Sequence, residues 1–327
     1  MERGRTWPLR LAALLLAAAA AFFLVRGCAW MPWNRGAEPL RVRVTITRSF
    51  GSEVISDQAV EMRPGDDAMR TLQKVAEVRT AYGGGFIEAV NGLESRYGGG
   101  GGTAGEKLDW FFYVNGQMAD MGAAAYQVRE GDWLIFDYHR WDLSPFTPAL
   151  SGCFPQPFLR GYGEPPSAVR VLYAAGWEQE ARETARLLQE AGAPSCEVAE
   201  MSEGWAPTRG TYELVLGTWK ELEGVPALAE ANRQAEAAGL FAFFRGGEMV
   251  LLDEEGCERA RYQGEAGLVT CTGPRLGNGA VLLVSGTDRA GVQAALSLLL
   301  EQPGGVPRLA LASWNGTALA VPAEGGR

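Results

Sequence analysis

The first clear pattern in the chain is an alternation of polar and apolar residues between positions 41 and 47. Charged or polar side chains alternate there with valine and isoleucine, which is the period of a half-buried strand. Phe50-Gly51-Ser52 then has the composition of a turn. Residues 53–62 are therefore expected to return beside residues 41–47 as the second strand of a hairpin.

A helix is expected after this hairpin. Pro64-Gly65-Asp66-Asp67 would start it with an acidic first turn, and acidic residues there interact favourably with the helix dipole. The apolar residues that follow recur with the spacing of one helical face. They are Ala68, Leu72, Val75, Ala76 and Val78.

Two aromatic-rich runs, residues 109–114 and 133–138, predict two further strands. Asn115-Gly116 ends the first run and suits a turn that needs positive φ, while Gly131-Asp132 makes a tight corner before the second run. Hairpin, helix and further strands in this order predict a beta-grasp domain over residues 40–141. In such an α+β domain, one helix packs on one face of a mixed sheet.

The aromatic residues of the first run need cover on both faces of this sheet. Side chains alternate along a strand, so Trp110 and Phe112 take one face, and Phe111 and Tyr113 take the other. One face packs on the helix. The other requires a second domain, a partner or a ligand, since a large bare aromatic patch is rare on soluble monomers.

A Pro- and Phe-rich stretch, residues 142–166, is expected to be an ordered linker, because few regular elements tolerate so many prolines. Beyond it, residues 167–327 alternate strand and helix patterns, which predicts an α/β layered domain with parallel strands. The strands expected there are residues 168–173, 196–198, 212–216, 241–244, 249–252 and 280–285, and the helices are residues 178–191, 227–238 and 290–300.

Four stretches within residues 40–141 resemble a known family. They are residues 44–51, Tyr82-Gly83-Gly84-Gly85-Phe86, residues 109–116 and residues 131–141. Together they resemble the beta-grasp C-terminal domain of the transcobalamin and intrinsic-factor type, which also occurs in extracytoplasmic bacterial proteins of unsettled function. In the vitamin carriers, the resemblance implies a module that closes over a corrinoid such as cobalamin, which is held mainly by a large helical domain. No segment of this chain is typical of that helical domain.

The resemblance and the aromatic pattern together suggest a ligand-binding site. We expect the aromatic face around Trp110 and Phe112 to supply apolar contact area, and the backbone of residues 82–86 and the strand end at Tyr138-His139 to orient polar groups. The expected ligand-binding residues are Tyr82, Gly83, Gly84, Gly85, Phe86, Trp110, Phe112, Tyr138 and His139. No cofactor and no metal ion are expected.

His139 is the only histidine in the chain. It is interpreted either as a satisfied side chain within an aromatic cluster, or as a pH-sensitive or ligand-contacting residue near a rim. Any serine or cysteine triad would have to centre on it, and the sequence contains no Gly-x-Ser-x-Gly motif. We therefore expect a protein that is not an enzyme, with a hydrolase acting through His139 as a further alternative.

The first 33 residues are expected to target or anchor the protein. Three arginines precede an apolar run, residues 11–25, and Arg26 ends it. This run is long for a signal peptide and short of the about 20 residues that span a bilayer. A retained membrane anchor, a lipoprotein with its lipid on Cys28, and a cleaved signal are the alternatives. Each places the residues beyond the linker at 34–39 on the extracytoplasmic side of the cell membrane.

Composition narrows the classes of function. Hydrophobic residues make up 47% of the chain, enough to build real cores, and the formal net charge of −9 repels nucleic-acid phosphates. Nucleic acid is therefore not an expected partner. The cysteines beyond residue 33 either form disulfides, in one of three pairings, or stay as free thiols, and no Cys-x-x-Cys metal spacing is present. They are Cys153, Cys196, Cys257 and Cys271.

These features predict a membrane-attached, extracytoplasmic protein that binds a small hydrophobic, ring-bearing ligand. A corrinoid is the first candidate by resemblance, and presentation of that ligand to a transporter permease would account for the anchor. The alternative is a structural or adhesive cell-surface module without a small ligand, in which the beta-grasp docks onto the α/β domain or onto a neighbouring protein.

Overall fold

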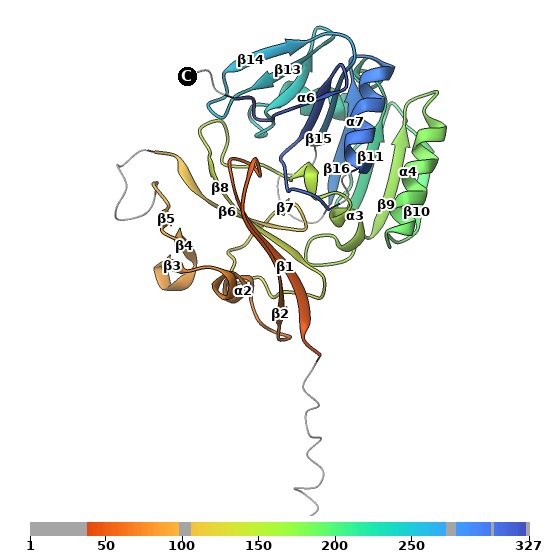
Figure 1. Ribbon diagram of the computed structural model, residues 1–327. Coiled ribbons are helices and arrows are strands. Elements are labelled where there is room, and N and C mark those ends of the chain that lie inside the picture. Colours follow the sequence, from red (N-terminus) through yellow and green to blue (C-terminus); the bar gives the residue numbers. More distant parts are fainter. Residues whose placement is uncertain (1–37, 98–105, 273–278, 302–303, 325–327) are drawn as a thin grey trace, which may run out of the picture. The chain divides into compact units, whose positions relative to one another are not determined.

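Two large sheets organise the computed structural model, which describes residues 38–97, 106–272, 279–301 and 304–324 (Figure 1). One sheet is formed by the N-terminal part of this region and the other by the C-terminal part. From Leu40 onward the chain forms one compact unit. The predicted domains at residues 40–141 and 167–327 therefore lie within one unit, and we call them its N-terminal and C-terminal halves. The division of this unit into two domains stays a prediction.

The N-terminal sheet contains the strands expected from the alternating pattern and from the aromatic runs. Its strands are β1 (Leu40–Arg48), β2 (Glu53–Met62), β6 (Leu108–Val114), β7 (Gln117–Met118) and β8 (Trp133–Arg140). They lie in the order β2-β1-β8-β6-β7. Strand β1 pairs antiparallel with β2 and parallel with β8, whereas β8 pairs antiparallel with β6. The sheet is therefore mixed, as the sequence predicts.

One helix, α2 (Ala68–Val75), follows β2 and packs against β1 and β2. The side chain of Asp67 caps its first turn by accepting a hydrogen bond from the Arg70 amide at 2.8 Å. The helix is shorter than its apolar stripe predicts, because the backbone becomes extended at Ala76. Val78, which was expected on the helix, already lies in a strand.

A small antiparallel sheet explains this early end of the helix. Its strands are β3 (Val78–Ala81), β4 (Phe86–Val90) and β5 (Leu93–Glu94). Glu77 exchanges backbone and side-chain hydrogen bonds with Asn91, at 2.8 and 3.0 Å, and these replace the bonds of a further helical turn. The 3₁₀ turn at Tyr82–Gly84 joins β3 to β4. Residues 82–85 are thus the turn of a hairpin.

The C-terminal half is built on the second large sheet. Its strands are β9 (Ala168–Tyr173), β10 (Cys196–Glu200), β11 (Thr211–Leu216), β15 (Ala266–Thr272), β16 (Ala280–Gly286), β17 (Leu311–Trp314) and β18 (Thr317–Leu319), in the order β10-β9-β11-β16-β15-β17-β18. The helices of this half are α4 (Glu178–Glu190), α5 (Trp219–Leu222), α6 (Pro226–Arg233) and α7 (Arg289–Glu301). A separate antiparallel sheet consists of β12 (Ala242–Arg245), β13 (Glu248–Leu252) and β14 (Glu258–Tyr262).

The pairs β10–β9, β9–β11 and β11–β16 are parallel, as the alternation of strands and helices predicts. Strand β15 was not expected, and it is antiparallel to both β16 and β17. Every residue of β15 is buried, so its sequence shows no alternation. It also contains Gly267, which would be taken for a turn residue. Helix α7 packs so closely here that a Cβ on Gly267 would lie 2.0 Å from the carbonyl oxygen of Gly291.

The connecting stretch at residues 142–166 packs into the hydrophobic core of the C-terminal half. Phe154 and Phe158 are buried in that core, as expected of an ordered linker. The stretch also contains two short helical segments that its prolines did not predict. They are η2 (Ser151–Cys153) and α3 (Gln156–Arg160).

Two hydrophobic clusters lie on the two faces of the five-stranded sheet. Leu134 and Phe136 of β8 belong to the cluster that includes α2, whereas Trp133 and Ile135 belong to the cluster that continues through the C-terminal half. The face not used by α2 is thus covered by the second half of the same chain. A hydrogen bond of 2.7 Å from the Gln117 amide to the Tyr212 hydroxyl joins the two halves.

Some expectations concern residues 1–37, including the anchor and Cys28, and these lie outside the described residues. Within the described part of the chain, no helix is both long and apolar enough to cross a membrane. The four cysteines beyond residue 33 are free thiols in the structure. Cys153 and Cys271 are buried, Cys196 is partly buried, and Cys257 is exposed.

Candidate functional site

The residues predicted to bind a ligand fall into three groups in the structure. The first is the exposed turn between β3 and β4. Tyr82 is 83% exposed there and adopts a positive φ of 51°, and Gly83 and Gly84 follow with φ of 72° and 96°. The Tyr82 ring lies edge-on to Phe86, with 6.2 Å between the ring centroids. This turn presents an aromatic ring and free backbone surface to solvent.

The second group, Trp110, Phe112 and Tyr138, is buried on the α2 face of the five-stranded sheet. The indole of Trp110 donates to the Leu93 carbonyl at 3.0 Å, and the Tyr138 hydroxyl donates to the Glu94 carbonyl at 2.5 Å. Strand β5 therefore covers both rings by binding their polar atoms through its backbone. Phe112 stacks on Phe136 in the same cluster. These rings pack the core in this structure, and their role as ligand contacts stays a prediction.

The third group is His139, which lies on the opposite face of β8 and is 1% exposed. Its ring is stacked between Phe50 and Phe111, with centroid distances of 4.1 and 4.0 Å. Its Nδ1 lies 2.6 Å from Oδ2 of Asp137, and Nε2 has no hydrogen-bond partner in the described part of the chain. The ring of His139 thus lies within an aromatic cluster, and its role as a pH-sensitive or ligand-contacting residue stays a prediction.

Asp137 is the polar centre of that face. The Thr47 hydroxyl donates to its carboxylate at 2.5 Å, and the backbone amides of Phe50 and Gly51 donate at 3.0 and 3.1 Å. With His139, four donors surround a carboxylate that is fully buried. A buried carboxyl group is tolerated when its oxygens are hydrogen-bonded in this way. The network fixes the β1–β2 turn to β8, which is a structural function.

A pocket of about 490 Å³ lies beside the exposed turn, and sequence reasoning did not predict it. It is lined by Leu40, Pro64, Gly65 and Met121 and by residues 125–130. The exposed turn reaches the chain beside Met121, since a Cβ on Gly122 would lie 3.3 Å from the Gly85 carbonyl oxygen. Met121, next in sequence, is 43% exposed. Its position in an Ala- and Gly-rich connection between the aromatic strands was the available sequence signal.

The pocket joins an apolar wall to a few polar groups. Val128 and Leu40 contribute to the wall, and the guanidinium of Arg129 forms no ion pair with any described residue. Tyr126 donates its hydroxyl proton to Asp132 at 2.9 Å, and burial raises the pKa of the Asp132 carboxyl. A few polar groups around apolar surface are typical of small-molecule sites.

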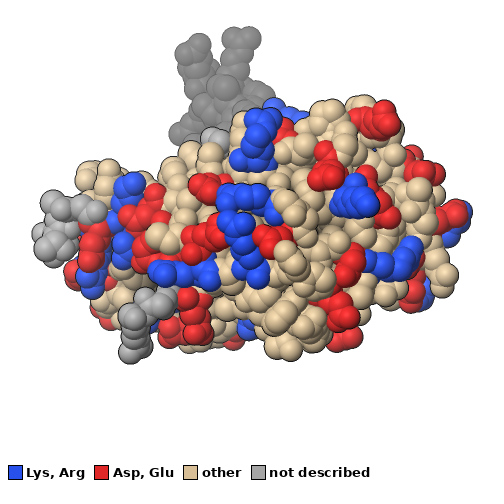
Figure 2. Space-filling view, turned by 90° about the horizontal axis from the view of Figure 1, so that it is seen from above, with Lys and Arg blue, Asp and Glu red and all other residues tan. Residues whose placement is uncertain are grey.

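Metal binding finds no support in the described ranges, where no group of three or more His, Cys, Asp or Glu side chains could hold an ion. On the face shown in Figure 2, basic and acidic side chains lie interspersed and often adjacent. This mixture differs from the basic stripe that nucleic-acid binding requires.

One family model matches part of this region. The model of a domain of unknown function (DUF4430) matches residues 65–140, about a quarter of the chain. The match contains α2, the exposed turn, and most of the residues that line the pocket. No curated protein matches the chain at a significant level.

Two solved structures resemble the chain distantly. Haptocorrin in complex with Cbi is 17% identical with a TM-score of 0.26, and the match covers 33% of this chain and 26% of haptocorrin. This chain therefore spans about a quarter of haptocorrin. A Ruminococcus gnavus protein provisionally described as metal binding is 14% identical with a TM-score of 0.23, covering 31% of this chain and 97% of that one. Likeness at this level defines neither a shared overall fold nor a shared ligand.

Proposed function

We propose that residues 40–141 form a beta-grasp module of the transcobalamin C-terminal type that binds a small, ring-bearing hydrophobic ligand without catalysing a reaction. The observation that carries this proposal is the pocket of about 490 Å³ beside the exposed turn at residues 82–85. A mixed sheet with one packed helix is the arrangement that such a module requires. Attachment to the outer face of a membrane through residues 1–33 belongs to the same proposal.

A corrinoid is the first ligand class to test. The pocket lies in the usual range for small-molecule sites, roughly 300–1,000 Å³, and would cover one edge of so large a ring. Met121 and Leu40 would contact the apolar edge, and Arg129 would lie near polar substituents. Tyr82, with its exposed ring, would stack on the ligand from the rim.

Calorimetric titration of the full chain, purified in a mild detergent, with cobalamin and cobinamide tests this proposal. We expect saturable binding that Tyr82→Ala weakens about 5- to 10-fold, which corresponds to about 1–1.4 kcal/mol. Tyr97→Ala is the matched control, since Tyr97 is also an exposed tyrosine but packs on Trp141 and lies outside the turn at residues 82–85. Equal affinity of the Tyr82 variant and the wild type would place the ligand elsewhere.

A second candidate function, docking without a small ligand, is favoured by the other face of the same sheet. Phe50, Tyr113, Trp133 and Ile135 from that face belong to the core of the C-terminal half. The sheet thus already serves as a protein-docking surface within the chain. Absence of binding to either corrinoid, with a folded protein, would favour this structural or adhesive role.

A further inference from the structure

Strand β2 forms the outer edge of the five-stranded sheet. It is ten residues long, and among the described residues β1 is the only strand that pairs with it. An edge strand presents unpaired backbone N–H and C=O groups, to which another strand can be added. None of the residues that line the pocket of the proposed ligand site lies on β2. This edge is therefore a separate candidate for an interaction surface.

The backbone groups that point away from β1 belong to alternate residues of β2. The amide of Arg43 in β1 donates to the Asp132 carbonyl at 2.9 Å, on the side away from β2. Its partner Ala59 therefore directs its own amide and carbonyl to the outer edge, as the alternation of an antiparallel pair requires. Asp57, two residues earlier on β2, does the same.

Two features limit the free stretch of this edge. At one end, the register of β2 against β1 shifts at Ile55, as in a β-bulge. At the other end, the ammonium group of Lys74 donates to the Glu61 carbonyl. Between them, the amides and carbonyls of Asp57 and Ala59 are the outward groups for which the described part of the chain supplies no partner.

The acidic residue at the centre of this stretch is neutralised within the chain. Charged side chains on an edge strand usually discourage pairing. Arg43 donates two hydrogen bonds to Asp57, at 2.9 and 2.7 Å, and the Thr45 hydroxyl donates a third at 3.0 Å. The neighbouring Gln58 is exposed and uncharged. The charge of Asp57 therefore protects the edge only weakly.

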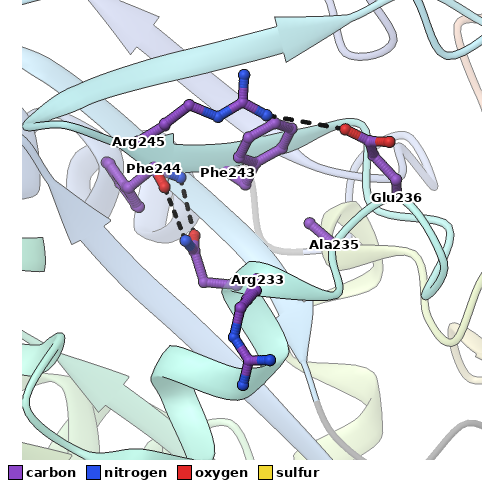
Figure 3. A pocket seen from close by; sticks show the side chains of 7 residues that line it. Arg233, Ala235, Glu236, Phe243, Phe244 and Arg245 are labelled. Atoms are coloured by element: carbon purple, nitrogen blue, oxygen red, sulfur yellow. Dashed lines mark hydrogen bonds and ion pairs between the residues drawn. The ribbon is translucent and has the colours of Figure 1, made fainter.

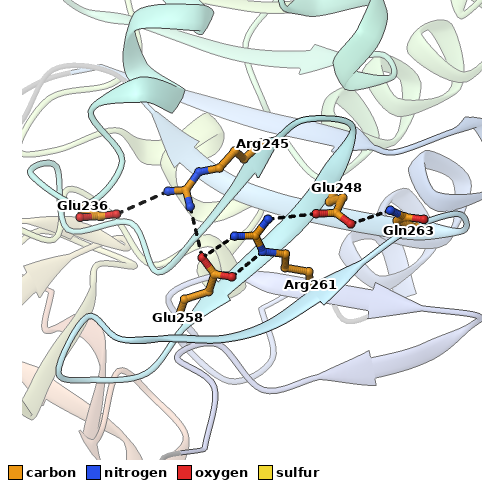
Figure 4. Close-up of polar contacts among 6 residues, drawn as sticks. All are labelled: Glu236, Arg245, Glu248, Glu258, Arg261 and Gln263. Atoms are coloured by element: carbon orange, nitrogen blue, oxygen red, sulfur yellow. Dashed lines mark hydrogen bonds and ion pairs between the residues drawn. The ribbon is translucent and has the colours of Figure 1, made fainter.

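Edges of the small sheet in the C-terminal half are better protected. The outer side of β12 is occupied by Asn232 of α6, whose side-chain amide donates to the Phe244 carbonyl at 2.7 Å and accepts from the Phe244 amide at 2.8 Å (Figure 3). A second pocket, of about 300 Å³, lies at this contact. On β14, the side chains of Glu258 and Arg261 belong to an ion-pair network that crosses the small sheet (Figure 4). Strand β2 has neither device between Ile55 and Glu61.

The free stretch of β2 is complementary to itself. If two β2 strands pair antiparallel with Gln58 of one copy opposite Gln58 of the other, Asp57 of each copy lies opposite Ala59 of the other. Four backbone hydrogen bonds then use all the free amides and carbonyls of both copies. A register shifted by two residues would place Asp57 opposite Asp57 or Glu61 of the other copy, where like charges repel.

We infer that this protein forms a symmetric dimer in which the β2 edges of two copies pair antiparallel about Gln58. The two five-stranded sheets join into one continuous sheet across a two-fold axis. The paired stretch is short, so the dimer is weak, as is usual for interfaces at the low end of the size range. This inference is independent of the proposed ligand.

Sedimentation equilibrium of the full chain in a mild detergent, over a series of protein concentrations, measures this association. We expect Ala59→Pro to weaken dimerisation at least about 10-fold, because proline lacks the outward N–H and its ring would meet the other strand. The fold should be retained, since this N–H is not bonded to β1 and edge strands accept proline at such positions. Ala59→Ser is the matched control: it keeps the N–H and should dimerise like the wild type.

Disulfide crosslinking tests the register. In a background with Cys28, Cys196 and Cys257 replaced by serine, Gln58→Cys should give a disulfide-linked dimer under mild oxidation. The two Cα atoms of this non-hydrogen-bonded pair would lie about 4.5 Å apart, which a disulfide can span. Ser56→Cys is the matched control, because Ser56 would lie opposite Val60 and the two new thiols would be roughly 13 Å apart along the strands. Intact mass without reducing agent measures both.

Three results would each overturn the inference. They are a monomer at every concentration, equal association of the wild type and Ala59→Pro, and equal crosslinking at positions 56 and 58. Equal association would place the contact elsewhere in the chain, for example in the apolar run at residues 11–25. The crosslinking experiment keeps the test valid even if Ala59→Pro is unstable, because Gln58 is exposed and its side chain bonds only to that of Ser56.

Discussion

The two faces of the five-stranded sheet are both buried, but they are held by different interactions. The face toward α2 is apolar, with Val44, Leu134 and Phe136 fully buried in one cluster. The face toward the C-terminal half contains polar groups as well, and the carboxylate of Asp137 lies at their centre with His139. One face is thus a conventional core, and the other is an interface with a buried hydrogen-bond network.

Because of this difference, we expect the two faces to tolerate amino-acid substitutions differently. Apolar contacts depend mainly on volume and tolerate substitution by similar side chains. A buried carboxylate with four donors depends on the position of each donor, and the loss of one partner leaves another unsatisfied. We therefore expect the interface face to be intolerant of changes that preserve size, and the α2 face to accept them.

The largest effect is expected for Asp137→Asn. The amide has nearly the same shape, but its nitrogen would replace one carboxylate oxygen and face donors there, either those of Thr47 and Gly51 at Oδ1 or that of Phe50 at Oδ2. The free energy of unfolding should fall by about 3–4 kcal/mol, as for other broken buried pairs. Urea unfolding at pH 7, followed by tryptophan fluorescence, measures it. Asp142→Asn, on the exposed end of the same segment, should change it by less than about 1 kcal/mol.

A smaller loss is expected for His139→Phe. The new ring can keep the stack between Phe50 and Phe111, while the bond to Asp137 is lost. A hydrogen bond to a charged group contributes about 1.5–3 kcal/mol, and removal of the unpaired Nε2 returns part of it. We expect a net loss of about 1–2 kcal/mol in the same urea experiment. A gain in stability would show that the unpaired nitrogen costs more than the bond to Asp137 contributes.

On the α2 face, Phe112→Leu should cost only about 1 kcal/mol, since the cluster around Phe136 can repack around a smaller apolar side chain. The comparison with Asp137→Asn in parallel urea titrations is the informative measurement. Equal losses for the two variants would mean that the two faces do not differ in tolerance.

The smallest loss of stability is expected at the exposed pair of Arg43 and Asp57. Arg43 donates to Asp57 at 2.7 and 2.9 Å, and this hydrogen bonding holds the pKa of the Asp57 carboxyl below its ordinary value of 3.8. The Asp57 side chain is 38% exposed, so solvent screens the pair and Asp57→Asn should cost less than about 1 kcal/mol at pH 7.

The pH dependence of this pair has a definite sign. Because the pKa is lower in the folded state, the pair stabilises the protein above pH 3.8 and loses this contribution as the pH falls through the folded-state value. Unfolding of wild type and Asp57→Asn at pH 7 and pH 3 should therefore give a difference that shrinks at pH 3. A larger difference in unfolding free energy at pH 3 than at pH 7 would contradict a lowered pKa of Asp57 in the folded protein.

Much of the fold could be predicted from local patterns. The alternation at residues 41–47 and the aromatic runs located β1, β6 and β8, and the alternation of strands and helices predicted the parallel strands around β9. The prediction failed where burial was continuous, as in β15. It also failed at Val78, where pairing with β4 replaced the end of the helix.

The candidate site was predictable only in part. Residues 82–85 were predicted as part of the candidate site, but the hairpin that contains them was not predicted. The pocket beside it was not predicted, because Leu40, Pro64 and Met121 come from three separate segments. The pairing of β1 with β8 and the packing of α2 bring these segments together, and neither has a local sequence signal.

The sequence by itself determined where the main strands and helices of this protein lie, and that the aromatic strands need cover on both faces. These properties follow from the period of side chains along a strand or a helix, which involves only neighbouring residues. The tertiary structure alone decided that the C-terminal half covers the second face, that Asp137 receives donors from the β1–β2 turn, and that two pockets form. Such contacts join residues far apart in the chain, as Gln117 and Tyr212 are, and only the packing of the whole unit brings them together.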